Sequence, residues 1–290
     1  MPNLTSTAIR RLARLEPFPQ PNVIPLRNPA VLMHGFGLLA FLAKGGHLHE
    51  EAMHLRVRGI LAFAPNVSPY DTISDRAVTW KSHIQEILSQ TRHTKVHLIA
   101  HSMGGLDARY LISELGMHKH VLSLTTISSP HRGSSIADIV LEQPGKIKEW
   151  LNDAANWLGE QAMINGNADF HRAIENLTPS AMTEDFNPKV INHPDVIYRS
   201  FAGGAGKGTL HSINPILRPF NSIIYAREGI NDGLVSVNSA IWGDYQGEIA
   251  ADHAQQIGID FMPSSNFSSN AFISDLIQDL SNQESGSTQP

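Results

Sequence analysis

One segment, Val96–Gly105 (VHLIAHSMGG), constrains the fold more than any other part of the chain, because a buried-strand pattern ends there and a helical pattern begins. Small residues lie two positions before and two positions after Ser102, namely Ala100 and Gly104. A strained strand-to-helix turn needs small residues there, since the backbone of the serine packs against both neighbours. The segment therefore predicts that Ser102 is held at the tip of a buried strand.

Short apolar runs and helical patterns alternate along much of the remaining chain. This alternation favours a mainly parallel central sheet flanked by helices. The predicted strands are Ala30–Met33, Gly59–Ala64, Val96–Ala100, Leu122–Ile127 and Val196–Phe201. Helices are predicted at Asp75–Ser89, with Ser74 or Asp75 as the N-cap, and at Met103–Leu115. A length of 290 residues fits one large α/β domain, which we expect to span residues 1–290.

Two segments depart from this alternation. Residues 141–187 read as helical and interrupt the strand–helix order, so they predict an inserted helical cap. Trp150, Trp157, Phe170 and Ile174 give the cap an apolar face that we expect to cover a binding cleft. Residues 281–290 (SNQESGSTQP) are polar and predict a disordered tail.

Ser102 is a candidate nucleophile that needs a base, because a serine hydroxyl is weakly nucleophilic at neutral pH. The base is a histidine, which a carboxylate holds in the required tautomer. On a sheet of this kind the chain order is serine, then acid, then histidine. Of the 15 histidines, only His253 has an acid candidate between the last predicted strand and itself, and the candidates are Asp232 and Asp244. Asp252 is adjacent to His253, so its side chain would normally point elsewhere. The order of residues leaves Asp232 and Asp244 open.

A second motif, Val31–Gly37 (VLMHGFG), predicts how the negative charge of a tetrahedral intermediate is stabilised. The strand ends at His34 and Gly35, so the backbone N–H of Phe36 can face the site. The N–H of Met103, directly after the candidate nucleophile, is the second donor at the positive end of a helix.

Composition excludes several other classes of function. The chain has no cysteine, which rules out disulfides, thiol catalysis and Cys-ligated metals. A net charge of −5 gives no reason to expect nucleic acid as a partner. His49 and His54 are five residues apart and do not share a helical face well, so their segment is not a zinc-binding H-E-x-x-H motif. No cofactor is expected.

Together these motifs resemble the bacterial true lipases of the α/β-hydrolase superfamily. The likeness spans most of residues 28–258 and includes HGFG, TKVHLIAHSMGG, TTISSPHRGSSIAD, NDGLVS and DHAQQIG. The run Met103–Ser113 also resembles intracellular triacylglycerol lipases of fungi. The resemblance implies an α/β-hydrolase fold, hydrolysis of acylglycerol esters, and a triad of Ser102, Asp232 and His253. It therefore favours Asp232 over Asp244.

The chain departs from those relatives near His253. They hold a structural calcium ion by the loop of the catalytic histidine, with a carboxylate two residues beyond it, whereas this chain has Gln255 there. Between residues 208 and 228 the only acid is Glu228. Calcium prefers several oxygen ligands with negative charge among them. We therefore expect no metal, and a His253 loop held by hydrogen bonds and packing.

The expected activity is hydrolysis of carboxylic esters of lipids, as a triacylglycerol lipase or a carboxylesterase, through an acyl-enzyme on Ser102. The alternatives are an acyltransferase with the same triad and a catalytically silent α/β hydrolase that only binds a ligand. The expected partners are an acyl ester and, transiently, a lipid interface; the oligomeric state stays open. No apolar run that would form a secretory signal is visible in residues 1–30, so we expect a cytoplasmic location, with secretion or an organelle as alternatives.

Overall fold

The computed structural model describes residues 22–36, 48–143, 145, 168–260 and 266–286. Within these ranges six strands form one sheet in the order β2-β1-β3-β4-β5-β6, and all neighbouring strands are parallel. The strands are β1 (Ala30–Met33), β2 (Ala62–Phe63), β3 (Val96–His101), β4 (Val121–Ile127), β5 (Ile197–Gly203) and β6 (Asp244–Ile249). The chain reverses its direction across the sheet between β2 and β3, so the loops after β1 and β3 lie side by side, where parallel sheets of this kind bind ligands.

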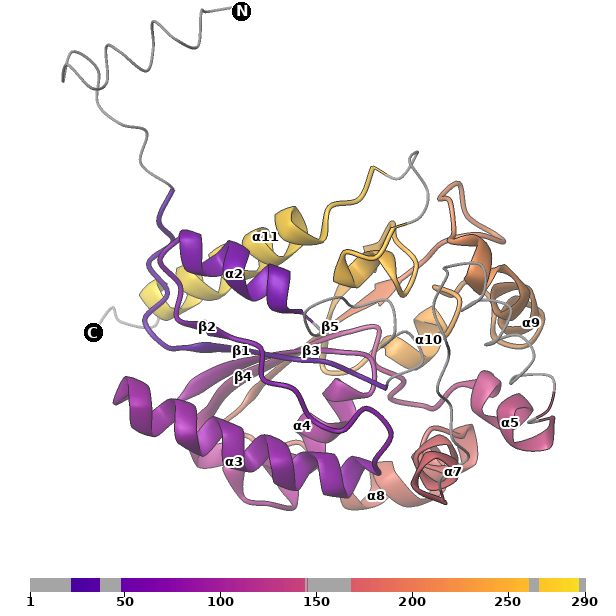
Figure 1. The fold of residues 1–290 in the computed structure, drawn as a ribbon, viewed down its shortest axis with the longest axis horizontal. Coiled ribbons are helices and arrows are strands. Elements are labelled where there is room, and N and C mark those ends of the chain that lie inside the picture. The colour runs from indigo at the N-terminus through magenta and orange to yellow at the C-terminus, as the bar shows by residue number, and fades with distance from the viewer. Residues whose placement is uncertain (1–21, 37–47, 144, 146–167, 261–265, 287–290) are drawn as a thin grey trace, which may run out of the picture.

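Helices cover both faces of the sheet (Figure 1). On one face lie α3 (Ile73–Thr91) and α4 (Gly104–Ser113), and on the other lie α2 (His49–Val57) and α11 (Ser269–Gly286). The other described helices belong to connections or lie near the carboxyl ends of the strands: η2 (Met117–His120), α5 (Ser135–Glu142), α7 (Ala168–Glu175), the π-helix η3 (Ala181–Phe186), α8 (Asn187–Lys189), η4 (Pro215–Leu217), α9 (Arg218–Glu228), α10 (Val237–Ala240) and η5 (Gln255–Ile257). No helix in the described ranges is long and apolar enough to span a membrane.

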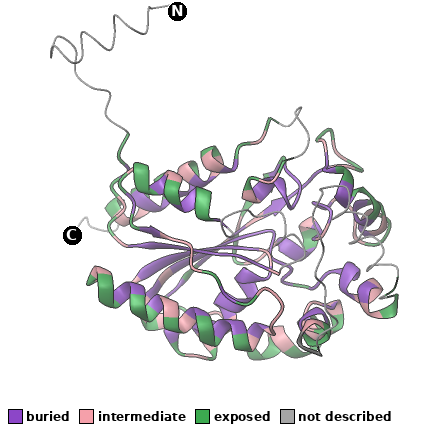
Figure 2. Cartoon of the chain, viewed as in Figure 1, coloured by how far each residue is buried: buried purple, intermediate pink, exposed green. Residues whose placement is uncertain are grey.

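The alternation of side chains along the strands divides the core into two layers. In β1, Val31 and Met33 pack with α3 and α4, whereas Leu32 packs with α2 and α11. Figure 2 shows the result: the strands are buried, and exposure is confined largely to the outer faces of the helices. A strand buried on both sides is mainly apolar, and β3 is buried at every position, which explains why the sequence predicts a strand at Val96–Ala100.

The predicted strands correspond to β1 through β5, although β2 is shorter than the predicted Gly59–Ala64. Strand β6 (DYQGEI) is not among the predicted strands, because this edge strand is mostly exposed and contains no apolar run. Helix α3 begins two residues earlier than predicted. Its N-cap is Thr72, whose Oγ1 accepts the backbone N–H of Asp75 at 3.3 Å.

The prediction that residues 281–290 form a disordered tail is wrong for residues 281–286, which continue α11. Ser281 is buried, and Glu284 binds the opposite end of the chain. Its carboxylate accepts hydrogen bonds from the backbone N–H of Arg27 at 2.7 Å, from Asn28 Nδ2 at 2.6 Å and from His97 Nε2 at 2.9 Å. Tertiary contacts therefore order a polar segment that has little intrinsic preference for structure. Residues 287–290 lie outside the described ranges.

Candidate active site

Ser102 lies in the turn between β3 and α4 and has a φ of 57°, in the left-handed region that a residue with a Cβ seldom adopts. Such a conformation costs about 1–3 kcal/mol and persists only where the surroundings enforce it. Here the Ser102 N–H donates to Ile127 O at 2.9 Å, and the Ser102 carbonyl accepts from Gly105 N at 3.0 Å. A Cβ on Gly104 would lie 2.7 Å from Met33 O, so the small residue expected at this position is required by packing.

Asp232 and His253 meet through a buried hydrogen bond, in which His253 Nδ1 donates to Asp232 Oδ2 at 2.7 Å. The second carboxylate oxygen, Oδ1, accepts the N–H groups of Leu234 and Val235 at 3.0 and 2.8 Å. Burial raises the pKa of Asp232, but the charge of His253 and these hydrogen bonds outweigh it and hold that pKa below the ordinary value. The carboxylate is therefore ionised and orients the histidine ring.

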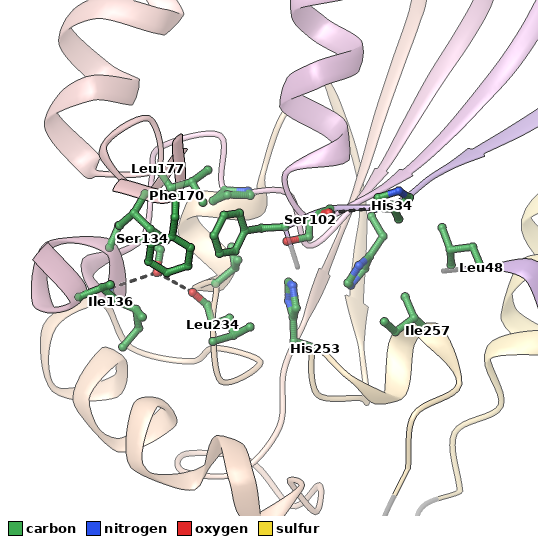
Figure 3. Close-up of a pocket in the computed structure, with 18 residues that line it drawn as sticks. His34, Leu48, Ser102, Ser134, Ile136, Phe170, Leu177, Leu234, His253 and Ile257 are labelled. Atoms are coloured by element: carbon green, nitrogen blue, oxygen red, sulfur yellow. Dashed lines mark hydrogen bonds between the residues drawn. The ribbon is translucent and has the colours of Figure 1, made fainter. Parts of the chain in front are cut away.

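The structure brings His253 and Ser102 into the wall of one pocket, and the His253 ring points toward Ser102 (Figure 3). The three predicted residues therefore come together although they lie at positions 102, 232 and 253 of the chain. The rival acid Asp244 does not join them. It is exposed at the first position of β6, opposite Arg199, and therefore at the amino ends of the strands, away from the pocket.

The predicted oxyanion donors, Phe36 and Met103, flank a narrow space beside Gly35. A Cβ on Gly35 would lie 2.9 Å from Met103 N and 2.9 Å from Ser102 Oγ, so only glycine leaves this space open. The Met103 N–H is therefore close to the Ser102 side chain, as an oxyanion donor must be, and its role and that of the Phe36 N–H stay predictions. The side chain of Phe36 packs on Tyr70 and Phe170, with ring centroids 5.7 and 5.5 Å away.

Arg76 and Asp107, which the sequence analysis missed, hold this segment in place. Arg76 Nη2 donates to His34 O at 2.7 Å, and Arg76 Nε donates to Asp107 Oδ2 at 2.9 Å. His34 is fixed further because its Nε2 accepts the Val67 N–H at 3.1 Å. Since α3 carries Arg76 and α4 carries Asp107, the ion pair joins both helices to the strand end before Gly35.

Gln256 is a second residue that the sequence analysis did not assign to the site. Its Nε2 donates to Asp232 Oδ2 at 3.1 Å, the same oxygen that binds His253. A Cβ on Gly203 would lie 2.0 Å from Gln256 Nε2, so the amide reaches Asp232 only past a glycine. Only the tertiary fold brings β5 and η5 together in this way, and no sequence pattern marks it.

The His253 loop is held by hydrogen bonds to the neighbouring Asp252, as predicted. Asp252 Oδ1 accepts the N–H groups of Ala254 and Gln255, both at 2.9 Å, and Oδ2 accepts the N–H of Asn214 at 2.6 Å. Burial raises the pKa of Asp252 to about 6, although these hydrogen bonds oppose the shift. In the ranges that the structure describes, no three His, Asp or Glu residues are grouped as metal ligands.

Ser102 and His253 divide the pocket into two sides (Figure 3). On one side α5 and α7 contribute apolar side chains, among them Ile136, Val140, Phe170 and Ile174. On the other side lie Leu48 and Ile257. The pocket is partly open to solvent, and its lining is predominantly apolar, as the binding of an acyl chain requires. Phe170 and Ile174 therefore line the cleft as predicted, whereas Trp150 and Trp157 lie outside the described residues.

Comparison with known proteins agrees with this geometry. Residues 69–156 match the family described as PGAP1-like alpha/beta domain. Triacylglycerol lipase 2 of Saccharomyces cerevisiae is 33% identical over 210 residues, which cover 70% of this chain and 59% of that protein. Triacylglycerol lipase of Pseudarthrobacter phenanthrenivorans is 34% identical over 118 residues, 39% of this chain and 36% of that protein. The structure of Bacillus licheniformis lipase BlEst2 in its mature form superposes with a TM-score of 0.64 at 22% identity, covering 91% of this chain and 96% of that one.

The chain has the α/β-hydrolase fold and is related to the triacylglycerol lipases. The resemblance inferred from the sequence motifs is confirmed, and so is the predicted fold class. This α/β-hydrolase chain spans less than two thirds of the length of the yeast and bacterial lipases with which it aligns.

Proposed function

We propose that the chain hydrolyses carboxylic esters of lipids through an acyl-enzyme on Ser102. The observation that carries the proposal is the meeting of a strained serine, a buried Asp232–His253 pair and an apolar pocket at one point. The relation to triacylglycerol lipases supports a lipid ester as the substrate. The apolar walls from α5 and α7 match the chemistry of an acyl chain and of transient contact with a lipid interface.

In the proposed mechanism His253 takes the proton of Ser102, whose Oγ attacks the ester carbonyl carbon. The N–H groups of Phe36 and Met103 stabilise the oxygen that becomes negative. The alcohol leaves with the proton from His253, and the acyl group stays on Ser102. Water then attacks this ester with His253 as the base, which releases the acid. Asp232 stays ionised throughout and stabilises the histidine while it carries the proton.

Hydrolysis of p-nitrophenyl esters of graded chain length tests the proposal. The wild type is expected to cleave them, to prefer an acyl chain longer than acetyl, and to label at Ser102 with a fluorophosphonate probe. The variant Ser102→Ala controls for hydrolysis that does not use the site. Failure of Ser102 to label would contradict the proposal and favour a silent ligand-binding protein. Transfer of the acyl group to an added alcohol at the expense of hydrolysis would assign an acyltransferase instead.

A further inference from the structure

A second, smaller cavity lies next to the pocket that contains Ser102. The two cavities share Leu48, His101 and Ile257 in their walls, so they are neighbours across the ring of His101. The His101 ring in turn packs against that of His253, with centroids 4.4 Å apart. The smaller cavity therefore adjoins the catalytic histidine on the side of Leu48 and Ile257, away from the apolar walls of α5 and α7 (Figure 3).

The smaller cavity has polar groups in a mainly apolar wall. Gln256 is 4% exposed, and its Nε2 donates hydrogen bonds to Asp232 Oδ2 and to Ala251 O. Its Oε1 has no hydrogen-bond partner among the described residues. Leaving such an oxygen unpaired in a protein interior costs about 1–3 kcal/mol. Glu51, also 4% exposed, lines the same cavity and accepts a hydrogen bond from Ser269 Oγ at 3.0 Å.

The size of the cavity decides which ligand fits it. Its free interior is on the scale of about one water molecule, and a water in a protein interior typically makes about three hydrogen bonds to polar groups. An acyl chain or a glycerol unit is too large. Gln256, Glu51 and Ser269 all line the cavity and carry polar groups that can bind a water molecule.

We propose that the smaller cavity is a water site that supplies the nucleophile for deacylation of Ser102. The proposal rests on the proposed ester hydrolysis and adds the source of its water. An acyl group attached to Ser102 lies on the side of α5 and α7, so it fills the pocket on that side. Water that enters past His101 reaches the ester from the other side.

The chemical step balances with water as the only added reactant. The water oxygen forms a bond to the acyl carbonyl carbon while His253 Nε2 takes one of its protons. The bond between that carbon and Ser102 Oγ then breaks, and the proton passes from His253 to Oγ. A carboxylic acid leaves, and the free serine is regenerated.

Ile273→Phe tests the proposal, because Ile273 on α11 lines the smaller cavity and does not line the larger pocket. The added ring volume fills the water site. Wild type and variant are given p-nitrophenyl octanoate with butan-1-ol, and the ratio of octanoic acid to butyl octanoate is measured. Butan-1-ol is too large for the smaller cavity and reaches the acyl-enzyme through the open pocket. In Ile273→Phe we expect the ratio of octanoic acid to butyl octanoate to fall about fivefold, equivalent to about 1 kcal/mol. We also expect a larger burst of p-nitrophenol, because deacylation by water is slower.

Ile277→Phe is the matched control, since Ile277 is buried on the same helix and borders neither of the two cavities. Its ratio of acid to butyl ester is expected to equal that of the wild type. Ser269→Val is a milder second variant that removes a polar group of the site and adds apolar volume, and it should shift the ratio in the same direction.

An unchanged ratio in folded Ile273→Phe or Ser269→Val, or an equal shift in Ile277→Phe, would overturn the water site. Failure of the proposed function appears in the wild type itself: a silent ligand-binding protein gives neither a burst nor a labelled Ser102, and an acyltransferase gives butyl octanoate at the expense of octanoic acid.

Discussion

Arg76 and Asp107 form an ion pair in which neither side chain has any exposed surface, and Arg76 Nη2 lies 2.8 Å from Asp107 Oδ2. The same guanidinium binds the carbonyl oxygen of His34, directly before Gly35 and the predicted oxyanion donor Phe36. One charged group therefore stabilises the interface of α3 and α4 and also positions a backbone segment of the site. The two roles can be separated by mutation.

Arg76→Met is expected to destabilise the fold by about 3–5 kcal/mol, because it leaves the buried charge of Asp107 without its opposite charge and with only the Trp80 Nε1 hydrogen bond at 3.2 Å. The double variant Arg76→Met/Asp107→Leu removes that charge and should recover most of the stability. Its kcat should still be about tenfold below the wild type, since the His34 carbonyl has lost its donor. Urea unfolding and rates on a short-chain ester measure the two effects. Full recovery of kcat in the double variant would show that Arg76 does not position the oxyanion segment.

Ser102→Ala, Asp232→Asn and His253→Ala should each lower kcat by about four orders of magnitude while leaving the protein folded. Combining two of them should lower it little further, because the three residues act as a unit. Asp244→Asn is the control, since its side chain is exposed at the start of β6. Steady-state rates and circular dichroism check the set. A larger loss in Asp244→Asn than in Asp232→Asn would refute the assignment of the acid.

The stability contributed by Asp232 should depend on pH in a defined direction. Its pKa is lower in the folded protein than the ordinary value of 3.8, so folding favours the ionised form. That contribution is fully present above the unfolded pKa and is lost as the pH falls through the folded pKa. The melting temperature of the wild type should therefore exceed that of Asp232→Asn by a margin that shrinks as the pH falls below about 4. A margin that grows with acidity would contradict the direction of the shift.

Ala137→Phe on α5 should shift the preference toward short acyl chains. Ala137 is 4% exposed and lines the pocket on the side of α5 and α7, so a ring there takes the space of distal methylenes. The rate of hydrolysis of a decanoyl ester should fall about tenfold relative to that of the acetyl ester, which corresponds to about 1.4 kcal/mol in activation free energy. Leu141→Phe on the same helix is the control, because Leu141 is not part of the pocket wall. An unchanged profile would place the acyl chain elsewhere.

Calcium is expected to have no effect on stability or rate. Asp252, the acid next to His253, already accepts hydrogen bonds from Asn214, Ala254 and Gln255. Melting temperature and esterase rate should be the same in EDTA and in millimolar calcium. Asp252→Asn, in contrast, should lower stability by about 1–3 kcal/mol, since the Asn214 N–H loses its charged acceptor. A melting shift of several degrees that calcium alone restores would contradict the prediction.

The parts of the site that the sequence predicted are those encoded by neighbouring residues. The turn at Ser102 requires small residues two positions before and two positions after the serine, and Ala100 and Gly104 meet this requirement. The sequence around Asp232 does not by itself place that residue in the site, because an Asn-Asp-Gly turn is common at protein surfaces. Here Asn231 is fully buried, and its Oδ1 accepts from Gly233 N at 2.9 Å and from Asn221 Nδ2 at 2.8 Å. Those contacts to α9 turn the segment inward, and no local pattern predicts them.

The parts that the sequence missed depend on distant contacts. Arg76 and Asp107 lie 31 positions apart and read as ordinary charges on two helices. Gln256 differs from an exposed glutamine only because Gly203 lies beside it. The cap over residues 141–187 and the cytoplasmic location stay predictions. Deleting residues 150–166, which lie outside the described ranges, and following the acyl profile tests the first; localisation of the tagged protein tests the second.

The hydrogen bonds that Glu284 accepts from the backbone of Arg27 and from Asn28 have a consequence for biosynthesis. These residues are 257 and 256 positions apart, so the partner that holds the chain just ahead of the first strand of the sheet leaves the ribosome long after that strand. Until then, the apolar face that α11 covers stays accessible to chaperones and to other nascent chains. Ribosome stalling before α11 is made would therefore leave a sheet whose first strand is paired but not covered. Such a product should aggregate or be degraded far more readily than a chain that contains α11.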